Sequence, residues 1–334
     1  MTDNKLKLVI GISQGVWNAF GDPATEKLLD PHPNVRVEVV YDEEQFAKLA
    51  LEADGVLTFN LKIPTQALQQ GSRLRWVHSI PAGIDAIATP ELLAAEHVAF
   101  TASKGPHAPL IAEQLVLLML SLARHMPALV HAQDACRWGR DEQDNVAQTS
   151  TQLLGKTIAI LGVGQIGRHL ARICKIGFGM KVLGMSRTSR DCEFVDEYFD
   201  RSNLHEALGE ADVVALCVAL TPATENIIGK AEFEAMKSTA FIINAGRGGL
   251  IDENALIDAM NANIIGGAGL DTVTVEPLPE TSPLWGLPNT IITPHSGPFT
   301  DNLGGEVVNF FIENIRRFAE DEPLLGIVHR DEGY

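Results

Sequence analysis

The chain has 334 residues, of which 46% are apolar and 21% are charged, as in an ordinary soluble globular protein. This length exceeds what a single small core needs, so we expect two domains. Asp and Glu number 43 against 26 Lys and Arg, and the formal net charge of −17 disfavours nucleic acid and anionic membranes as partners.

The cysteines and the longest apolar stretch bear on where the protein works. Cys136, Cys174, Cys192 and Cys217 form no CxxC pair, and their spacing suggests neither a disulfide framework nor a zinc site. The apolar stretch at residues 115–123 has about half the length of a membrane span, and the first residues show no signal-peptide pattern. We therefore expect a cytoplasmic protein with no metal and no membrane partner.

Short β-rich runs alternate with segments of helical spacing over the N-terminal part of the chain. Helical spacing occurs, for example, at residues 43–52 and 65–70. The strands predicted in this part are residues 8–12, 35–40, 55–59, 75–79 and 98–101. Such alternation predicts an open parallel α/β sheet.

Two segments separate this part from the next. Residues 108–125 are apolar almost all round, which predicts a helix buried on every side, between the two domains. The polar residues 137–152 have no strong pattern, and we expect an exposed arm or loop there.

A second alternation begins at Leu154. The strands predicted in it are residues 157–161, 181–185, 213–218, 240–244, 267–270 and 290–293. Helical segments such as 166–175 and 253–261 lie between these strands. Residues 301–320 have the pattern of one amphipathic helix.

These patterns predict an α/β fold of two doubly wound, Rossmann-like parallel-sheet domains with a cleft between them. A glycine motif lies mid-chain, and the helix at 301–320 follows the last strand of the second alternation. We therefore expect residues 1–103 and 297–334 to form a discontinuous substrate domain, and residues 104–296 to form the dinucleotide-binding domain.

The glycine motif has the pattern GxGxxG and lies between a predicted strand and a predicted helix, which is the context of dinucleotide binding. Gly162 permits a tight turn, Gly164 lets the backbone approach a pyrophosphate, and Gly167 lets the helix pack on the strand. The predicted helix begins at Ile166, directly after Gln165, and its N-terminus directs N–H groups and a positive dipole end at the phosphates.

The end of the next strand decides which dinucleotide binds. An NAD site usually has Asp or Glu there, roughly 20 residues after the motif, but here no carboxylate occurs before Asp191. The turn carries Ser186, Arg187, Thr188 and Arg190 instead. An Arg can pair with a 2′-phosphate, and hydroxyls can donate hydrogen bonds to it. We therefore expect NADP as the cofactor, with NAD less favoured.

Three segments that follow late strands carry the groups needed for catalysis, since ligands bind at the carboxyl ends of strands in open α/β sheets. They contain Arg247, Glu276 and His295. Reduction of a 2-keto acid needs a cation for the substrate carboxylate, an acid for the carbonyl oxygen, and a carboxylate that keeps this acid charged. The three residue types favour that chemistry.

These segments resemble those of the D-isomer-specific 2-hydroxyacid dehydrogenases. The resemblance covers nearly the whole chain, through residues 82–85, 112–114, the glycine motif, residues 220–222 and the three catalytic segments. The turn at 186–188 and the ending at 331–334 look like the glyoxylate/hydroxypyruvate reductase branch.

The resemblance implies roles for single residues. Arg247 would bind the substrate carboxylate and carbonyl. His295 would donate the proton in reduction and accept it in oxidation, and Glu276 would pair with His295 and keep it protonated near neutrality. Backbone N–H groups at Ala82 and Gly83 would complete the carboxylate site.

Further residues are expected at the cofactor. Asp271 would lie by the nicotinamide, and Val218, Ala219 and Ala245, at or just after the ends of predicted strands, would also contact the cofactor. Two positions depart from the family pattern: Ser296 stands where a small apolar residue is common, and Ala219 where Pro is common. Neither removes a chemical group.

The sequence thus predicts an NADP-dependent enzyme that reduces small 2-keto acids, such as glyoxylate or hydroxypyruvate, to D-2-hydroxy acids. The alternatives are a dehydrogenase of bulkier acids such as phenylpyruvate or 2-ketoisocaproate, a formate- or phosphite-type oxidase, and a non-catalytic dinucleotide-sensing corepressor. Glu276 argues against the formate type, which carries Gln there. The segment 137–152, with Trp138, is where the family commonly dimerises, and it predicts a homodimer.

Overall fold

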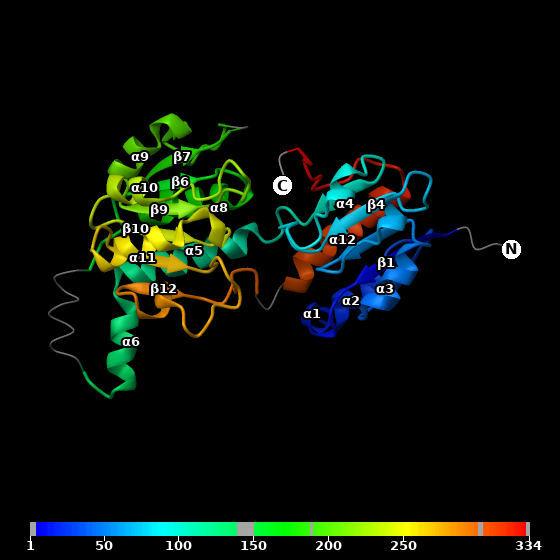
Figure 1. Ribbon diagram of the computed structural model, residues 1–334, viewed down its shortest axis with the longest axis horizontal. Coiled ribbons are helices and arrows are strands. Elements are labelled where there is room, and N and C mark those ends of the chain that lie inside the picture. Colours follow the sequence, from blue (N-terminus) through cyan, green and yellow to red (C-terminus); the bar gives the residue numbers. More distant parts are fainter. Residues whose placement is uncertain (1–4, 139–149, 188–189, 300–302, 332–334) are drawn as a thin grey trace. The chain divides into compact units, whose positions relative to one another are not determined.

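The structure is a computed structural model that describes residues 5–138, 150–187, 190–299 and 303–331. The chain divides into two compact units, Met1–His107 with Phe299–Tyr334, and Ala108–Pro298. Each unit is a parallel sheet with helices on both faces, which confirms the predicted fold class (Figure 1). The sequence prediction put the borders after residues 103 and 296. The roles of the units and the expected cleft stay predictions.

The first unit contains a five-stranded parallel sheet in the order β2-β1-β3-β4-β5. Its strands are β1 (Leu6–Gly11), β2 (Val35–Val40), β3 (Gly55–Thr58), β4 (Trp76–Ser79) and β5 (Ala99–Ala102). All five were predicted, with ends that differ by at most two residues.

Alternation along β1 directs its side chains into two separate cores. Leu8 and Ile10 belong to the core on one face, and Val9 to the core on the other. The first face is covered by α1 (Gln14–Ala19), α2 (Asp22–Leu29) and α12 (Leu303–Ala319). The second is covered by α3 (Glu43–Ala50), the 3-10 turn Thr65–Leu68 and α4 (Pro90–Ala94).

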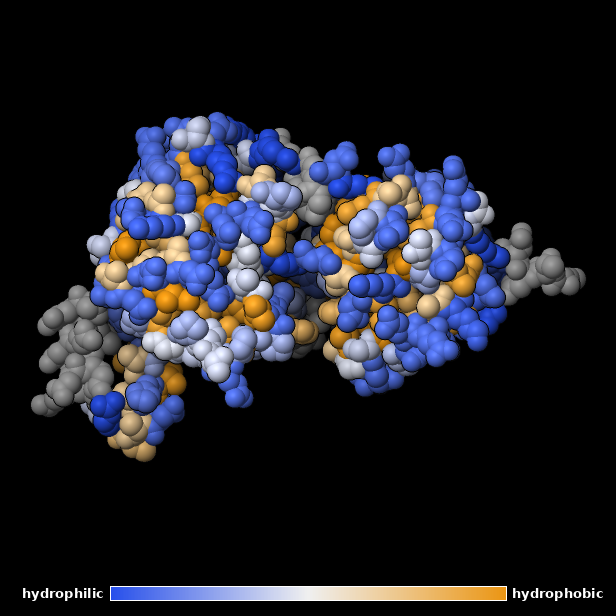
Figure 2. Space-filling model, viewed as in Figure 1, coloured by the Kyte–Doolittle hydropathy of each residue, from blue (hydrophilic) through white to orange (hydrophobic). Residues whose placement is uncertain are grey.

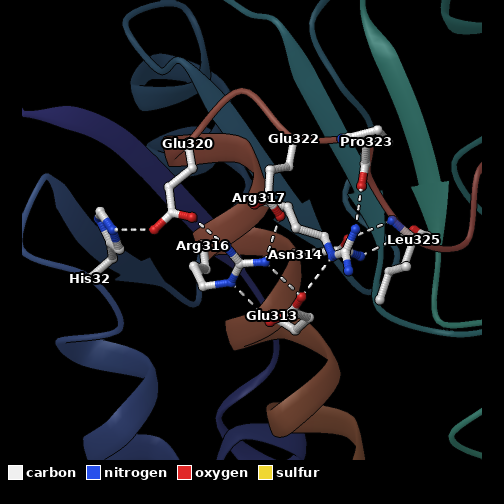
Figure 3. A network of polar contacts seen from close by, with 9 residues as sticks. All are labelled: His32, Glu313, Asn314, Arg316, Arg317, Glu320, Glu322, Pro323 and Leu325. Carbon is white, nitrogen blue, oxygen red and sulfur yellow. Dashed lines mark hydrogen bonds and ion pairs between the residues drawn. The ribbon is translucent and has the colours of Figure 1, made fainter.

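A network of polar contacts lies at the C-terminal end of α12 (Figure 3). Arg316 pairs with Glu313, Glu320 and Glu322, and Arg317 donates to Glu313 at 2.7 Å. The hydrogen bond from Arg316, together with that from Arg317, lowers the pKa of Glu313 to about 2. Because these ion pairs are partly exposed to solvent, each contributes little to stability.

The turn after α12 is fixed by the buried side chain of Asn314. It donates to the carbonyl of Leu325 at 3.1 Å and accepts from the N–H of the same residue at 2.8 Å. The chain then forms an antiparallel bridge with β5, and the N–H of Ala102 donates to the carbonyl of Gly326 at 2.8 Å. The C-terminal segment therefore covers the outer edge of β5.

The second unit contains a seven-stranded parallel sheet in the order β12-β11-β10-β9-β6-β7-β8. Its strands are β6 (Thr157–Leu161), β7 (Lys181–Met185), β8 (Glu197–Phe199), β9 (Val213–Leu216), β10 (Phe241–Asn244), β11 (Gly267–Leu270) and β12 (Thr290–Ile292). The sequence prediction missed β8, because this edge strand has three residues and buries only Phe199. The other six were predicted.

Helices cover both faces of this sheet as well. One face carries α5 (Ala108–Ala123) and α8 (Gln165–Arg172), which continues into a π-helical turn at Ile173–Gly177. The other carries α9 (Leu204–Glu210), α10 (Lys230–Ala235) and α11 (Glu253–Asn261), with 3-10 turns at Arg201–Asn203, Gly248–Leu250 and Pro283–Gly286. From β6 the chain adds β7 and β8 on one side of the sheet, and then returns to add β9 and the later strands on the other side. The point between β6 and β9 is therefore the switch point at which such sheets bind ligands.

The helix predicted over residues 108–125 is α5, which ends at Ala123, and a second helix, α6 (Met126–Asp134), follows it at an angle of 72°. The prediction that it is buried on every side is wrong, because Leu117 and Leu120 on α5 are 54% and 37% exposed. Composition shows which residues are apolar but not which of them other elements cover. Within the described ranges no single helix is long and apolar enough to span a membrane, although the bent pair meets the criteria of length and composition.

The exposed apolar residues continue onto α6, where Met126 and Val130 are 42% and 45% exposed. We call these two residues, with Leu117 and Leu120, the α5–α6 apolar surface. In Figure 2 hydrophilic residues cover most of the visible face, and α6 shows apolar as well as hydrophilic surface.

Candidate active site

The glycine motif forms a compact loop at the switch point of the second sheet. Gly162 has a φ of 105°, and a Cβ there would lie 2.7 Å from the backbone of Cys217, just after β9. A Cβ at Gly167 would lie 2.1 Å from the carbonyl oxygen of Gly162. Nothing lies within 4 Å of the Cβ position of Gly164. Gly162 and Gly167 therefore allow the close backbone approaches that shape the loop, and Gly164 leaves open space beside its backbone.

This loop fits a pyrophosphate. Gly164 is the N-cap residue of α8 and has no side chain to satisfy the first N–H groups of the helix. Gln165 and Ile166 begin the helix, so their N–H groups lie at its positive end. Val218 and Ala219 follow β9, which is hydrogen-bonded to β6, and Ala245 follows β10, the next strand across the sheet.

The turn after β7 carries the residues expected at a 2′-phosphate. Arg187 is exposed and Ser186 is half-buried, whereas Thr188 lies outside the described residues. Arg190 pairs with Asp200 and lies 5.9 Å from the centre of the Tyr198 ring. Asp191, the first carboxylate of the turn, pairs with Arg168 of α8. A cation therefore neutralises this carboxylate.

Arg247 lies on a turn that follows β10. The buried side chain of Asn244 fixes this turn, donating to the carbonyl of Arg247 at 2.8 Å and accepting from the N–H of Gly246 at 3.0 Å. A Cβ at Gly248 would lie 2.0 Å from the backbone of Val273. The turn with Arg247 thus packs directly against the loop that leads to Glu276.

His295 and Glu276 are in contact. His295 Nδ1 lies 2.8 Å from Glu276 Oε2, and their side chains are 40% and 38% exposed. The other carboxylate oxygen of Glu276 accepts from the N–H of Val273 at 3.2 Å. His295 has a φ of 52°, a conformation that a non-glycine residue rarely adopts unless its surroundings impose it.

Asp271 imposes that conformation. Its carboxylate is 2% exposed and accepts from Thr293 Oγ1 at 2.5 Å, from Gln114 Nε2 at 3.2 Å, and from the N–H groups of Ser296 and Gly297 at 3.0 Å each. Its carbonyl accepts from the N–H of His295 at 2.8 Å. Asp271, predicted to contact the cofactor, therefore also holds the turn that carries His295.

Gln114 and Thr293 were missed as site residues. The signal for Gln114 was its position as a lone amide on the apolar helix α5. Thr293 offered only its position just after β12.

The residues predicted to bind substrate come from both units. Ala82 and Gly83 follow β4 in the first unit, where the hydroxyl of Ser79 donates to the carbonyl of Gly83 at 2.9 Å. Arg247, Glu276 and His295 belong to the second unit.

Burial raises the pKa of Cys217, beside the glycine loop, to about 12, so this thiol is protonated at neutral pH and is no nucleophile.

Comparison with known proteins agrees with this geometry. Residues 116–297 match the family model of the D-isomer specific 2-hydroxyacid dehydrogenase NAD binding domain. The chain is 33% identical over 300 residues to glyoxylate/hydroxypyruvate reductase B of Enterobacter sp. (strain 638), which covers 87% of this chain and 90% of that protein.

Two solved structures resemble the fold over nearly its whole length. A D-isomer specific 2-hydroxyacid dehydrogenase family protein from Aeromonas salmonicida subsp. salmonicida A449 has a TM-score of 0.80 at 31% identity and covers 98% of this chain and 100% of its own. A D-isomer specific 2-hydroxyacid dehydrogenase from Xanthobacter autotrophicus Py2, in complex with NADPH and MES, has a TM-score of 0.79 at 26% identity and covers 99% and 100%.

The glycine motif offers a matched pair of substitutions. Gly167→Ala should lower the free energy of unfolding by about 1–3 kcal/mol, because the new Cβ meets the carbonyl of Gly162. Gly164→Ala should leave thermal unfolding unchanged, yet raise the Kd for NAD(P)H, since its methyl group would occupy the open space where we expect the pyrophosphate. Thermal melts and fluorescence titrations separate the two effects, and equal melting temperatures for both variants would contradict this account of the loop.

Proposed function

This chain belongs to the D-isomer-specific 2-hydroxyacid dehydrogenase family, and we propose that it reduces small 2-keto acids, such as glyoxylate or hydroxypyruvate, to D-2-hydroxy acids. The family makes it an oxidoreductase with an NAD(P)-binding domain. The contact of 2.8 Å between His295 and Glu276 carries the proposal, because it holds a proton donor at the carboxyl end of the sheet that also bears Arg247. The name of the Enterobacter relative favours glyoxylate and hydroxypyruvate over bulkier acids.

The proposal assigns a role in the reaction to each of these residues. The bound nicotinamide supplies the hydride to the keto carbon. His295 donates a proton from Nε2 to the carbonyl oxygen, while its Nδ1–H stays hydrogen-bonded to Glu276, whose charge stabilises the protonated ring. Arg247 pairs with the substrate carboxylate and polarises the carbonyl. The N–H groups at Ala82 and Gly83 bind the same carboxylate.

We infer NADP as the preferred cofactor from the turn after β7. Arg187 would pair with the 2′-phosphate, and the hydroxyl of Ser186 would donate a hydrogen bond to it. Asp191 is paired with Arg168, which lowers its repulsion of a phosphate. The Xanthobacter relative was solved with NADPH. The other cofactor contacts, including the one at Asp271, stay predictions, as does a cytoplasmic location.

Assays of the purified protein test the reaction. With NADPH, it should reduce glyoxylate and hydroxypyruvate with higher kcat/KM than phenylpyruvate or 2-ketoisocaproate. His295→Gln should lower kcat by about 10²- to 10⁴-fold, because general acid catalysis contributes that much, and it should leave the Kd for NADPH unchanged. Glu280→Gln, at an exposed carboxylate of the loop that carries Glu276, is the control and should keep wild-type kcat. Absence of turnover with every 2-keto acid would refute the proposal.

The choice of cofactor has its own test. Arg187→Ala should lower kcat/KM for NADPH by about 10- to 150-fold, since a charge-assisted contact contributes roughly 1.5–3 kcal/mol, and should change it little for NADH. Ser186→Asp should add repulsion of the phosphate and an acceptor for the NADH ribose, so the double variant should prefer NADH. A wild type that prefers NADH, or a ratio that Arg187→Ala leaves unmoved, would show that this interpretation of the turn is wrong.

We also propose that the protein is a homodimer. The exposed apolar residues of α5 and α6 and Trp138, which is 88% exposed, support this, because exposed apolar surface marks interaction sites. Of the segment 137–152 expected to take part, residues 139–149 lie outside the described residues.

Sedimentation velocity tests the dimer. The wild type should sediment as a dimer at micromolar concentration, and Leu117→Asp should shift it toward monomer, because a charge in the buried part of an interface is costly. Leu29→Asp is the matched control, since Leu29 is 51% exposed on α2 of the first unit, against 54% for Leu117. A monomeric wild type, or an equal shift in both variants, would argue against this surface.

A further inference from the structure

A row of buried polar side chains lies behind the loop that follows β4. His78 on β4 contacts the hydroxyl of Thr101 on β5 through Nδ1 at 2.7 Å, and the hydroxyl of Ser103 through Nε2 at 3.1 Å. Trp76 Nε1 donates to the same Thr101 hydroxyl at 2.8 Å. All four residues have no exposed surface. The proposed reaction uses none of them.

The hydrogen bonds of His78 account for its burial. His78 and Thr101 are register partners on adjacent strands, so their side chains share one face of the sheet. On that face Phe310 and Phe311 of α12 pack against the imidazole, with ring centres at 6.0 and 5.2 Å. Burial lowers the pKa of His78 to about 3, so the ring is neutral at pH 7. Since hydroxyls both donate and accept, either neutral tautomer satisfies both ring nitrogens.

Ser103 and Ser79 connect this row to the loop. The N–H of Ser103 donates to the carbonyl of Ser79 at 3.2 Å, which fixes the end of β4. The hydroxyl of Ser79 then donates to the carbonyl of Gly83 at 2.9 Å, which fixes the peptide after Gly83. These hydrogen bonds, joined through the atoms of Ser103 and Ser79, therefore link the imidazole of His78 to the loop.

We propose that His78 is a positioning residue for substrate binding, which acts through Ser103 and Ser79 to hold the N–H groups at Ala82 and Gly83 in the conformation that receives the substrate carboxylate. The proposal rests on the proposed function, which assigns the carboxylate to this loop. A carboxylate is bound equally in the ground state and in the transition state, so a displaced loop raises KM and leaves kcat nearly unchanged.

Two substitutions at His78 form a matched pair. The amide of Gln reaches the position of Nε2 and can keep the contact with Ser103, whereas the amide of Asn reaches only the position of Nδ1 and keeps the contact with Thr101. With saturating NADPH, His78→Asn and Ser103→Ala should raise the KM for glyoxylate about tenfold, because a small misplacement of binding groups is costly. Their kcat should stay within about twofold of wild type. His78→Gln should resemble the wild type.

Hydrogen–deuterium exchange supplies a readout that needs no turnover. The amides of Ile80 and of residues 82–84 should exchange about tenfold faster in His78→Asn than in His78→Gln, because only the former loses the contact that leads to the loop. Equal exchange and equal KM in the two variants would overturn the proposal, as would a lowered melting temperature in both with KM unchanged. A wild type that reduces no 2-keto acid would refute the proposed function alone, because the exchange comparison still tests the link from His78 to the loop.

Discussion

The turn that carries His295 in the second unit depends on one buried group, the carboxylate of Asp271. A carboxylate so little exposed is stable only where donors surround it. Here the donors come from Gln114 on α5, from Thr293 after β12, and from the backbone that follows His295. The hydrogen bonds to this carboxylate therefore hold α5, the end of β12 and the turn after His295 close together. His295 acquires its left-handed backbone conformation as a consequence, and its ring then meets Glu276.

Backbone contacts between neighbouring loops complete the arrangement. Gly248 lets the turn after β10 approach Val273, and Gly162 lets the turn after β6 approach Cys217. In each case the two loops follow adjacent strands of the sheet. The order of the strands thus decides which loops touch, and the glycines decide how closely. A glycine motif alone does not make this site, because its partner loop comes from a strand that lies far along the chain.

The sequence was sufficient where residues either alternate or carry distinctive chemistry. The core strands satisfy the first condition and the glycine motif satisfies the second, whereas the catalytic roles of Arg247, Glu276 and His295 stay predictions. It was insufficient for β8, whose three residues bury one side chain, and for the exposed stripe of α5, since composition does not reveal which surface is covered. Gln114 follows Glu113 on an otherwise apolar helix, His78 precedes Ser79 in β4, and no spacing marks either of them. Their partners become evident only from the packing of the helix and the register of the strands.

The two units hold their loops by a common physical means. Apolar packing is non-directional, whereas a hydrogen bond constrains both distance and angle. In the first unit His78 contacts Ser103, and in the second Gln114 and Thr293 contact Asp271. These polar groups lie on or beside the regular elements, while the groups expected to touch substrate lie on the turns. Because burying a polar side chain is costly unless it is hydrogen-bonded, each of these buried side chains holds the groups that it contacts at a fixed distance and angle.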